Sequence, residues 1–438
     1  MATASGAAAK KRARRGELWQ GAGQQDADGH ADARLASASA DLRRASLEGL
    51  VNDANVLPKL LSLDTGDVAP LLIGCGNATV DVTCEVSRAD LARFGLRPGM
   101  EAAGLPDTTK AAIVDFCTAA AGAAMAAPGG AAMNTTRVAA WCAGAGLRAA
   151  FIGAVGRDAH GDVLRAALIE AGVIPLLKQA SPDQKTGVCA VLVERETRDR
   201  TLSTVRGAAG ALDAAFVEEL EVAALVDEAS LLYLTSFVLT TQPRLGAAEA
   251  LAERVCGRAA GAGALAINLS SAGVLGKVRE PLLRLLPRAR YAFGNGGELR
   301  AFGAMLGWPE VDGDVRTAVS RLADLLAEGG VAVITAGGEP TLAAERGSGR
   351  TQSFEVPALA KCEIEDTNGA GDAFVGGFLA RAVASVGGRG AAPSLGECVE
   401  HGHRCAALIL RRRGCDLRGS RPPSACAIGP EGAATSEL

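Results

Sequence analysis

The chain has 438 residues, of which 48% are hydrophobic and 21% charged, and its formal net charge is −4. This length suits one large α/β domain or two smaller ones, and the weak negative charge does not indicate nucleic-acid binding. The eleven cysteines form no Cys-x-x-Cys pair, so we expect mostly buried, reduced side chains rather than disulfides or a zinc site. No apolar run reaches about 18 uninterrupted residues, so no membrane span is predicted.

Residues 1–67 are predicted to be a disordered extension, residues 68–418 a globular domain, and residues 419–438 a disordered tail. The extension contains a basic cluster at Lys10, Lys11, Arg12, Arg14 and Arg15. A solvated charge run is the favoured interpretation of this cluster, and a nuclear import signal is the alternative. Acidic residues between Glu17 and Asp28 argue against a long transit peptide, so we expect a cytoplasmic protein with nuclear import as the alternative.

The globular part is predicted to begin with an apolar strand at Leu71–Ile73, which ends in a Gly-x-Gly-Asn turn. Asn77 closes this turn, and Asp81 follows four residues later. An amide and a carboxylate at the end of a first strand can hydrogen-bond the hydroxyl groups of a polyol. Ordinary turn residues are the alternative interpretation of both side chains.

Two glycines, Gly129 and Gly130, precede a predicted helix that carries Asn134 in its first turns. A plain helix start is the alternative to a binding loop here. The segments 82–104 and 187–204 are short and mixed in pattern, and we assign them to a small β lid. The lid contains a predicted hairpin with Arg200, which is a candidate to neutralise phosphate or close over a site. A solvated arginine is the alternative.

Strands and helices then alternate along the chain. The predicted strands are 231–234, 264–269 and 291–294, and the predicted helices are 243–260 and 280–286. This alternation predicts a doubly wound, mostly parallel sheet with helices on both faces, in addition to the small lid. Ligands of such sheets bind beyond the carboxyl ends of the strands, where the polar candidates above are expected to lie.

Near the end of the domain, the stretch Asp366–Asp372 reads Asp-Thr-Asn-Gly-Ala-Gly-Asp. We expect a short extended segment before it, at Lys361–Glu365, and a helix after it. Small residues at Gly369, Ala370 and Gly371 let backbone N–H groups at a helix start approach an anion. Asp372 can accept a proton from a hydroxyl group that attacks a phosphoryl group held there. An ordinary helix N-cap is the alternative.

The heptapeptide resembles the signature of the carbohydrate kinase family that includes ribokinase, fructokinase and adenosine kinase. Its continuation, Ala-Phe-Val-Gly-Gly-Phe, is similar to the adenosine kinase branch. The resemblance covers about residues 70–418 in at least six ordered segments. It implies a ribokinase-like fold and ATP-dependent phosphorylation of a sugar or nucleoside hydroxymethyl group. For the adenosine kinase branch the reaction converts adenosine and ATP to AMP and ADP.

The resemblance also implies a role for each matching residue. Asp372 is the general base, and the amides of Gly369, Ala370 and Gly371 hold the transferring phosphoryl group. Asp81 binds the ribose hydroxyls, because one carboxylate can accept from both hydroxyls of a diol. The other implied substrate contacts are Asn77, Gly129, Gly130, Asn134 and Phe237. The implied ATP contacts are Asn268, Asn295, Thr335, Gly337, Asn368 and His403.

A magnesium ion keeps several waters, and Glu298 can orient them one helical turn after Asn295. A glutamate favoured by the helix dipole is the alternative interpretation. The expected partners are adenosine and ATP, with Mg²⁺ as the cofactor, no nucleic acid, no membrane and a monomeric chain.

The sequence departs from the branch at three positions. Gly273 and Val238 stand where related enzymes carry aromatic residues that clamp the base, and Gly296 stands where adenosine kinases commonly carry glutamate. A lost stacking partner costs roughly 1–3 kcal/mol per base. A kinase for another nucleoside or a sugar therefore stays open. So does a catalytically idle nucleoside-binding protein, although the retained Asp372 argues against it.

Overall fold

The computed structural model describes residues 69–98, 102, 105–121, 126–197, 199–258, 263–309, 313–383, 392–418 and 422. The predicted extension at residues 1–67, with its basic cluster, lies outside the described residues. The same is true of the predicted tail, except for residue 422.

Within the described residues, a nine-stranded sheet forms the centre of the domain. In spatial order its strands are β13 (Thr351–Phe354), β12 (Glu339–Glu345), β11 (Val331–Ala336), β10 (Ala289–Asn295), β9 (Ala264–Asn268), β8 (Leu231–Thr235), β1 (Leu71–Cys75), β4 (Arg148–Val155) and β5 (Val173–Gln179). The seven neighbouring strands from β11 to β5 in this order pair in parallel, and β12 and β13 are antiparallel at one edge. Strands β1 and β8 are apolar and buried along their whole length, as expected when helices cover both faces of a parallel sheet.

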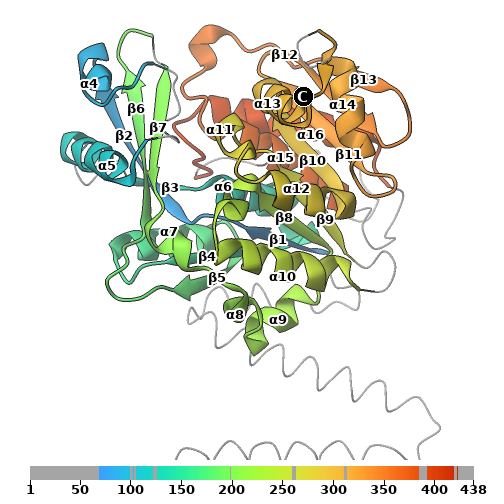
Figure 1. Cartoon of the computed structure of the whole chain (residues 1–438), viewed down its shortest axis with the longest axis horizontal. Coiled ribbons are helices and arrows are strands. Elements are labelled where there is room, and N and C mark those ends of the chain that lie inside the picture. Colours follow the sequence, from blue (N-terminus) through green and yellow to red (C-terminus); the bar gives the residue numbers. More distant parts are fainter. Residues whose placement is uncertain are drawn as a thin grey trace, which may run out of the picture. The chain divides into compact units, whose positions relative to one another are not determined.

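Helices cover both faces of this sheet (Figure 1). Helix α6 (Ala131–Ala143) packs on β1, β4 and β8, and α15 (Ala370–Ala382) lies between α6 and α16 (Leu395–Leu410). Helix α10 (Arg244–Cys256) packs on β8 and β9, and α13 (Gly296–Leu306) packs on β10 and β11. The remaining helices are α4 (Arg88–Arg93), α5 (Asp107–Ala121), α7 (Ala159–Glu170), α8 (Ala214–Val217), α9 (Leu220–Val226), α11 (Ala272–Leu275), α12 (Arg279–Leu285) and α14 (Val315–Asp324). Short 3-10 helices are η3 (Gly144–Gly146), η4 (Gly207–Ala211), η5 (Ser236–Thr240), η6 (Leu286–Arg288) and η8 (Lys361–Glu363).

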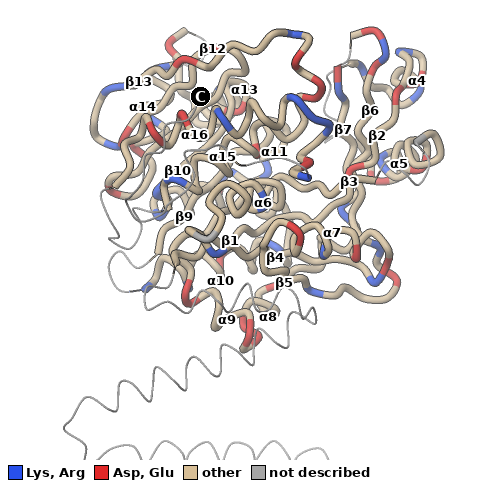
Figure 2. The backbone as a smooth tube through the Cα atoms, turned by 180° about the vertical axis from the view of Figure 1, so that it is seen from behind, with Lys and Arg blue, Asp and Glu red and all other residues tan. Residues whose placement is uncertain are grey.

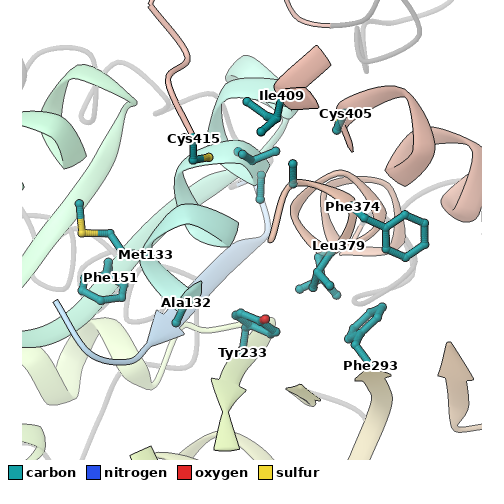
Figure 3. Close-up of a cluster of buried hydrophobic side chains, with 14 of the residues drawn as sticks. Ala132, Met133, Phe151, Tyr233, Phe293, Phe374, Leu379, Cys405, Ile409 and Cys415 are labelled. Carbon is teal, nitrogen blue, oxygen red and sulfur yellow. The ribbon is translucent and has the colours of Figure 1, made fainter. Parts of the chain in front are cut away.

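The contact of α15 with its two neighbours depends on small residues. A Cβ atom at Gly376 would lie 2.7 Å from the Thr135 carbonyl oxygen on α6, and one at Gly377 would lie 2.7 Å from the Cys405 Sγ on α16. Phe378 on the same helix packs edge-on against Phe293 of β10, with 5.1 Å between the ring centroids. Figure 3 shows the core that these three helices share with the sheet. Close packing therefore fixes the start of α15 relative to α6.

A small sheet stands beside the large one (Figure 1). Its order is β3 (Ala126–Gly129), β2 (Thr79–Val86), β6 (Gly187–Glu194) and β7 (Arg200–Val205). Strands β2 and β6 pair in parallel from Thr79–Gly187 to Val86–Glu194, and α5 packs on the sheet. The predicted lid segments fall on or beside these strands, with 99–101, 103, 104 and 198 outside the described residues. The sequence pattern did not predict β3 or α5.

The predicted extended segment at Lys361–Glu365 is wrong. Residues Lys361–Glu363 form the 3-10 helix η8, in which the Glu363 carboxylate accepts from the backbone N–H of Ala360 at 3.0 Å. The backbone N–H of Glu365 then donates to the Leu410 carbonyl at 2.8 Å. The chain therefore crosses the end of α16 instead of joining the sheet. Helix α15 begins at Ala370, so Gly371 and Asp372 belong to its first turn and not to the preceding loop.

Acidic and basic residues are interspersed along the tube in Figure 2, and the central strands are largely uncharged. In the part of the chain that the structure describes, no helix is both long and apolar enough to cross a bilayer. Most of the described cysteines are buried and are thiols rather than members of disulfides, as the sequence predicts.

Candidate active site

A cavity of about 830 Å³ opens at the carboxyl ends of the parallel strands. The ends of β1, β8, β9, β10 and β11 are neighbours across the sheet, and the cavity runs along all five. The starts of α6 and α15 also line it. The predicted site residues that line the cavity are Asn77, Asp81, Gly130, Asn134, Phe237, Asn268, Asn295, Glu298, Thr335, Asn368, Gly369, Gly371 and Asp372.

Asp372 lies in the first turn of α15 and contacts α6. The Nδ2 of Asn134 donates to its Oδ2 at 3.0 Å, and the Thr135 hydroxyl donates to its backbone carbonyl at 3.2 Å. Burial raises the pKa of the Asp372 carboxyl to about 6, while the Asn134 hydrogen bond lowers it. A carboxylate with a pKa close to neutral pH and a fixed position suits a general base.

The start of α15 has the backbone that an anion site needs. Gly369 caps the helix with φ of +79°, a left-handed conformation that favours glycine. The first-turn N–H groups of a helix have no intrahelical acceptor and carry partial positive charge. Gly369 and Gly371 line the cavity, and a Cβ atom at Gly371 would meet nothing within 4 Å. A group with several anionic oxygens can therefore approach these amides closely.

Asp81 enters the cavity from β2 of the small sheet. The Nδ2 of Asn368 donates to its Oδ2 at 3.3 Å. A Cβ atom at Gly129 would lie 2.1 Å from its Oδ1, so glycine at that position makes room for the carboxylate. Burial raises the pKa of Asp81 to about 7. The Asn368 hydrogen bond lowers it, and the carboxylates of Asp372 and Asp366 raise it further.

At the other end of the cavity, Asn295 and Glu298 form a capping box at the start of α13. The Glu298 carboxylate accepts from the backbone N–H of Asn295 at 2.9 Å and from its Nδ2 at 2.8 Å. Each carboxylate oxygen can accept a second hydrogen bond from a water on a metal ion. The residue set thus fits the outer coordination of a hard cation that is also bound by phosphates. The adjacent Thr335 hydroxyl donates to the Gly294 carbonyl at 3.4 Å.

Five predicted site residues are not among those that line the cavity: Gly129, Ala370, Gly337, His403 and Arg200. His403 lies in the core, where its Nε2 is 2.8 Å from the Thr341 Oγ1 and its ring centroid is 5.3 Å from that of Phe374. Because Phe374 lines the cavity, His403 lies behind it. Arg200 of the small sheet forms an ion pair with Asp366 and donates to the Thr367 Oγ1 at 3.0 Å. It therefore joins the small sheet to the loop that leads into α15.

Sequence reasoning missed several residues that line the cavity or support its wall. Lys277 and Arg206 line the cavity, but isolated basic residues carry no pattern. Tyr233 lies at the centre of β8 and accepts from the Asn268 Nδ2 at 3.2 Å. A tyrosine in an otherwise aliphatic strand, in a chain with only two tyrosines, was a usable signal. Arg244, whose side chain is buried behind Asn77, gave no signal at all.

Residues 115–420 match the pfkB family carbohydrate kinase pattern. The chain therefore belongs to the pfkB family of carbohydrate kinases, and the predicted family and ribokinase-like fold are confirmed.

Several proteins that this chain is similar to are adenosine kinases. Adenosine kinase 1 of Arabidopsis thaliana is 29% identical over 80% of this chain and 97% of its own length. The adenosine kinase of Saccharomyces cerevisiae is 31% identical over 71% of this chain and 88% of its own. The crystal structure of Anopheles gambiae adenosine kinase, in complex with P1,P4-di(adenosine-5) tetraphosphate, superposes with a TM-score of 0.71. It is 28% identical and covers 81% of this chain and 98% of its own.

Proposed function

We propose that this chain is an adenosine kinase, which transfers the γ-phosphoryl group of ATP to the 5′-hydroxyl group of adenosine. The predicted enzyme class, an ATP-dependent phosphotransferase with an alcohol acceptor, follows from its family and its relatives. One observation carries the proposal. A single cavity has a carboxylate and a helix N-terminus at Asp372, and it extends in both directions along the strand ends.

Asp372 acts as the general base. The acceptor hydroxyl binds within hydrogen-bond distance of its carboxylate and passes its proton to it as the oxygen attacks phosphorus. The bond from phosphorus to the β-phosphate oxygen breaks, and ADP leaves with that oxygen. Asn134 fixes the orientation of the carboxylate through its 3.0 Å hydrogen bond.

The first-turn amides of α15 stabilise the charge of the transferring phosphoryl group. Such donors already point at the place where charge develops, so no reorganisation is needed during the reaction. ATP lies over the ends of β9, β10 and β11, at the polar side chains of Asn268, Asn295 and Thr335. Glu298 would hold the waters of an Mg²⁺ ion, which would supply charge neutralisation at the ATP phosphates.

Adenosine lies at the other end of the cavity. Asp81 accepts from its ribose hydroxyls, and Asn77, Asn134 and Phe237 contact the rest of the nucleoside. A relative binds a molecule in which a tetraphosphate joins two adenosine groups, which matches a site that extends to both sides of a phosphoryl position. A cavity of about 830 Å³ is within the usual range for small-molecule sites.

The base pocket is the least family-like part of the site. Val238 is buried away from the cavity, and the aromatic side chains that line it are Phe237, Phe293 and Phe374. This favours, as the second candidate, a kinase for another nucleoside or a sugar with the same base and anion site.

The test is ATP-dependent phosphorylation of adenosine, inosine, guanosine, ribose and fructose by the native chain and by the Asp372→Asn variant. We expect turnover of adenosine, and a fall in kcat of about 10²–10⁴-fold in the variant. The Asp183→Asn variant, at an exposed turn, is the matched control and keeps native kcat. If the chain phosphorylates only a sugar, adenosine is not the acceptor and the sugar takes its place in the proposal. Adenosine binding without turnover of any acceptor would favour a binding protein.

The cytoplasmic location, the monomeric state and the absence of a nucleic-acid partner stay predictions. Deletion of residues 1–15 in a fluorescently tagged chain tests the location. Unchanged nuclear accumulation would contradict an import role for the basic cluster.

A further inference from the structure

Arg244 is the largest fully buried side chain among the described residues, with an exposed fraction of 1%. It is the first residue of α10. Within the described part of the chain, no ion pair includes it. A buried guanidinium without a carboxylate is costly, because neutral acceptors replace only part of its hydration. The pKa of Arg244 is lowered to about 10 by burial and by Arg206, so the group is still charged at neutral pH.

Arg244 donates hydrogen bonds to four residues that all line the cavity. Its Nη1 donates to the Asn77 Oδ1 at 2.6 Å and to the Phe237 carbonyl at 3.0 Å. Its Nη2 donates to the Thr240 Oγ1 at 2.7 Å and to the Thr241 Oγ1 at 2.8 Å. All four residues line the cavity, whereas Arg244 does not. The guanidinium therefore lies directly behind one end of the cavity wall and connects the turn after β1 to the η5 segment.

The contact with Asn77 also fixes the chemistry of that side chain. A guanidinium only donates, so the amide oxygen of Asn77 must face it and the amide nitrogen must point elsewhere. In the part of the chain that the structure describes, Asn77 Nδ2 has no protein acceptor, and Asn77 lines the cavity. Asn77 therefore offers N–H donors to the ligand. A free asparagine can present either its oxygen or its nitrogen, but this one cannot.

We propose that Arg244 is a positioning residue that fixes Asn77 as a hydrogen-bond donor to the nucleoside and holds the η5 segment that carries Phe237. The inference rests on the proposed function, because it assigns this end of the cavity to the nucleoside. Asn77 then selects a ligand with an acceptor atom, such as a purine ring nitrogen or a hydroxyl oxygen, at that position. A ligand with a hydrogen-bond donor at that position would face the N–H groups of Asn77 and would bind more weakly.

The experiment compares Arg244→Met and Asn77→Asp with the native chain. Met removes the charge at similar volume. Asp keeps the acceptor for Arg244 but has no N–H to give to the ligand. We expect each variant to raise the KM for adenosine at least about tenfold, with the KM for ATP within about twofold of native. The double variant is no worse than the worse single variant. The melting temperature of Asn77→Asp stays at or above the native value, because a carboxylate now pairs with the buried guanidinium.

Arg254→Met is the matched control on the same helix. Arg254 pairs with Glu218 and Asp227 and does not line the cavity, so its KM for adenosine stays native. A folded Arg244→Met or Asn77→Asp variant with the native KM for adenosine would overturn the proposal. If Arg244→Met does not fold, Asn77→Asp and Arg244→Lys decide the question.

The two proposals fail in different ways. If the native chain phosphorylates a different nucleoside, the adenosine assignment falls, and the same variants are tested with that nucleoside. If the native chain binds adenosine without turnover, calorimetric affinity replaces KM. A chain that neither binds nor phosphorylates a nucleoside overturns both.

Discussion

Two of the carboxylates that line the cavity, Asp372 and Asp81, are held by different parts of the molecule. Asp372 starts a helix that is wedged between α6 and α16, and α6 contacts it through both Asn134 and Thr135. Asp81 stands on the small sheet, where the Asn368 side chain reaches it at 3.3 Å. The proton transfer proposed for Asp372 thus takes place among the tightly packed helices α6, α15 and α16. Binding of the substrate also depends on the small sheet, which side-chain contacts join to these helices.

Among the variants that keep both carboxylates in place, the largest expected effect comes from adding charge beside Asp372. The Asn134→Asp variant places a second carboxylate where an amide now donates to Asp372 at 3.0 Å. Like charges at this distance raise the pKa of the pair, so the acid limb of the kcat–pH profile should move up by about one unit or more. We expect kcat at pH 7 to fall about 10–100-fold. Asn134→Ala, which adds no charge, should shift the limb less. If the acid limb of the kcat–pH profile stays in place in both variants, Asp372 is not the group that accepts the proton.

The next effect concerns the space around Asp81. In the Gly129→Ala variant a Cβ atom would stand 2.1 Å from the Asp81 Oδ1, so the carboxylate must move. We expect the KM for adenosine to rise about tenfold or more through the lost hydrogen bonds, with a smaller change in kcat. Gly313→Ala is the control, because a Cβ atom there meets nothing within 4 Å. If the KM for adenosine is the same in both variants, Asp81 does not bind the nucleoside.

Acidification should separate the two carboxylates without any mutation. Asp81 has a pKa of about 7 and Asp372 of about 6. As the pH falls from 8, the KM for adenosine should rise first, by up to about tenfold per unit below the Asp81 pKa, because a protonated carboxyl accepts poorly. The fall in kcat should begin near pH 6. The Asp81→Asn variant should lose the pH dependence of KM and keep that of kcat; an unchanged profile would contradict the assignment.

The same pKa values determine the sign of the stability effect. Both carboxyls have raised pKa values in the folded chain, so the folded state holds their protons more tightly than the unfolded state. Their contribution to the free energy of unfolding is complete below about pH 3.8 and is lost as the pH rises through 6–7. The Asp81→Asn variant should therefore melt above the native chain at pH 8.

The smallest expected effect concerns the link between the two regions. Arg200 and its partner Asp366 have side chains that are only 17% and 12% exposed. Arg200→Gln should lower kcat/KM about 3–10-fold, because the small sheet is held less firmly over the cavity. Arg88→Gln on the same side of the molecule is the control, since its pair with Glu196 is 61% and 76% exposed. If kcat/KM is the same in the two variants, the ion pair between Arg200 and Asp366 has no part in closing the site.

Much of the site could be predicted because parallel strands end at one edge. Asn77, Asn268, Asn295 and Thr335 each follow or finish a buried strand, and that placement alone brings them to a common cavity. The heptapeptide predicted Asp372 and the anion turn for a similar reason, since a glycine-rich turn before a helix has one main geometry.

The remaining features depend on contacts between distant segments. The pairing of β2 with β6 joins residues more than 100 positions apart, and no local pattern selects that partner. Arg244 looks like a solvated arginine at a helix start, and only the fold shows that Asn77 and η5 surround it. His403 occupies its expected place on α16, but its side chain direction is determined by Thr341 and Phe374.

The contact between Asn134 and Asp372 spans 238 positions of the sequence. At about 5–20 residues per second, a ribosome needs roughly 10–50 s to travel from one to the other. During that interval the nascent chain already contains α6, the turn with Asn77 and the strand with Asp81, but not the helices that cover α6. Val138 is buried in the finished protein, where a Cβ atom at Gly376 of α15 would lie 2.8 Å from it, and until α15 is made it has no permanent neighbour on that side. The active site can therefore be assembled only near the end of translation. Until then the nascent chain exposes an apolar surface of the kind that chaperones bind.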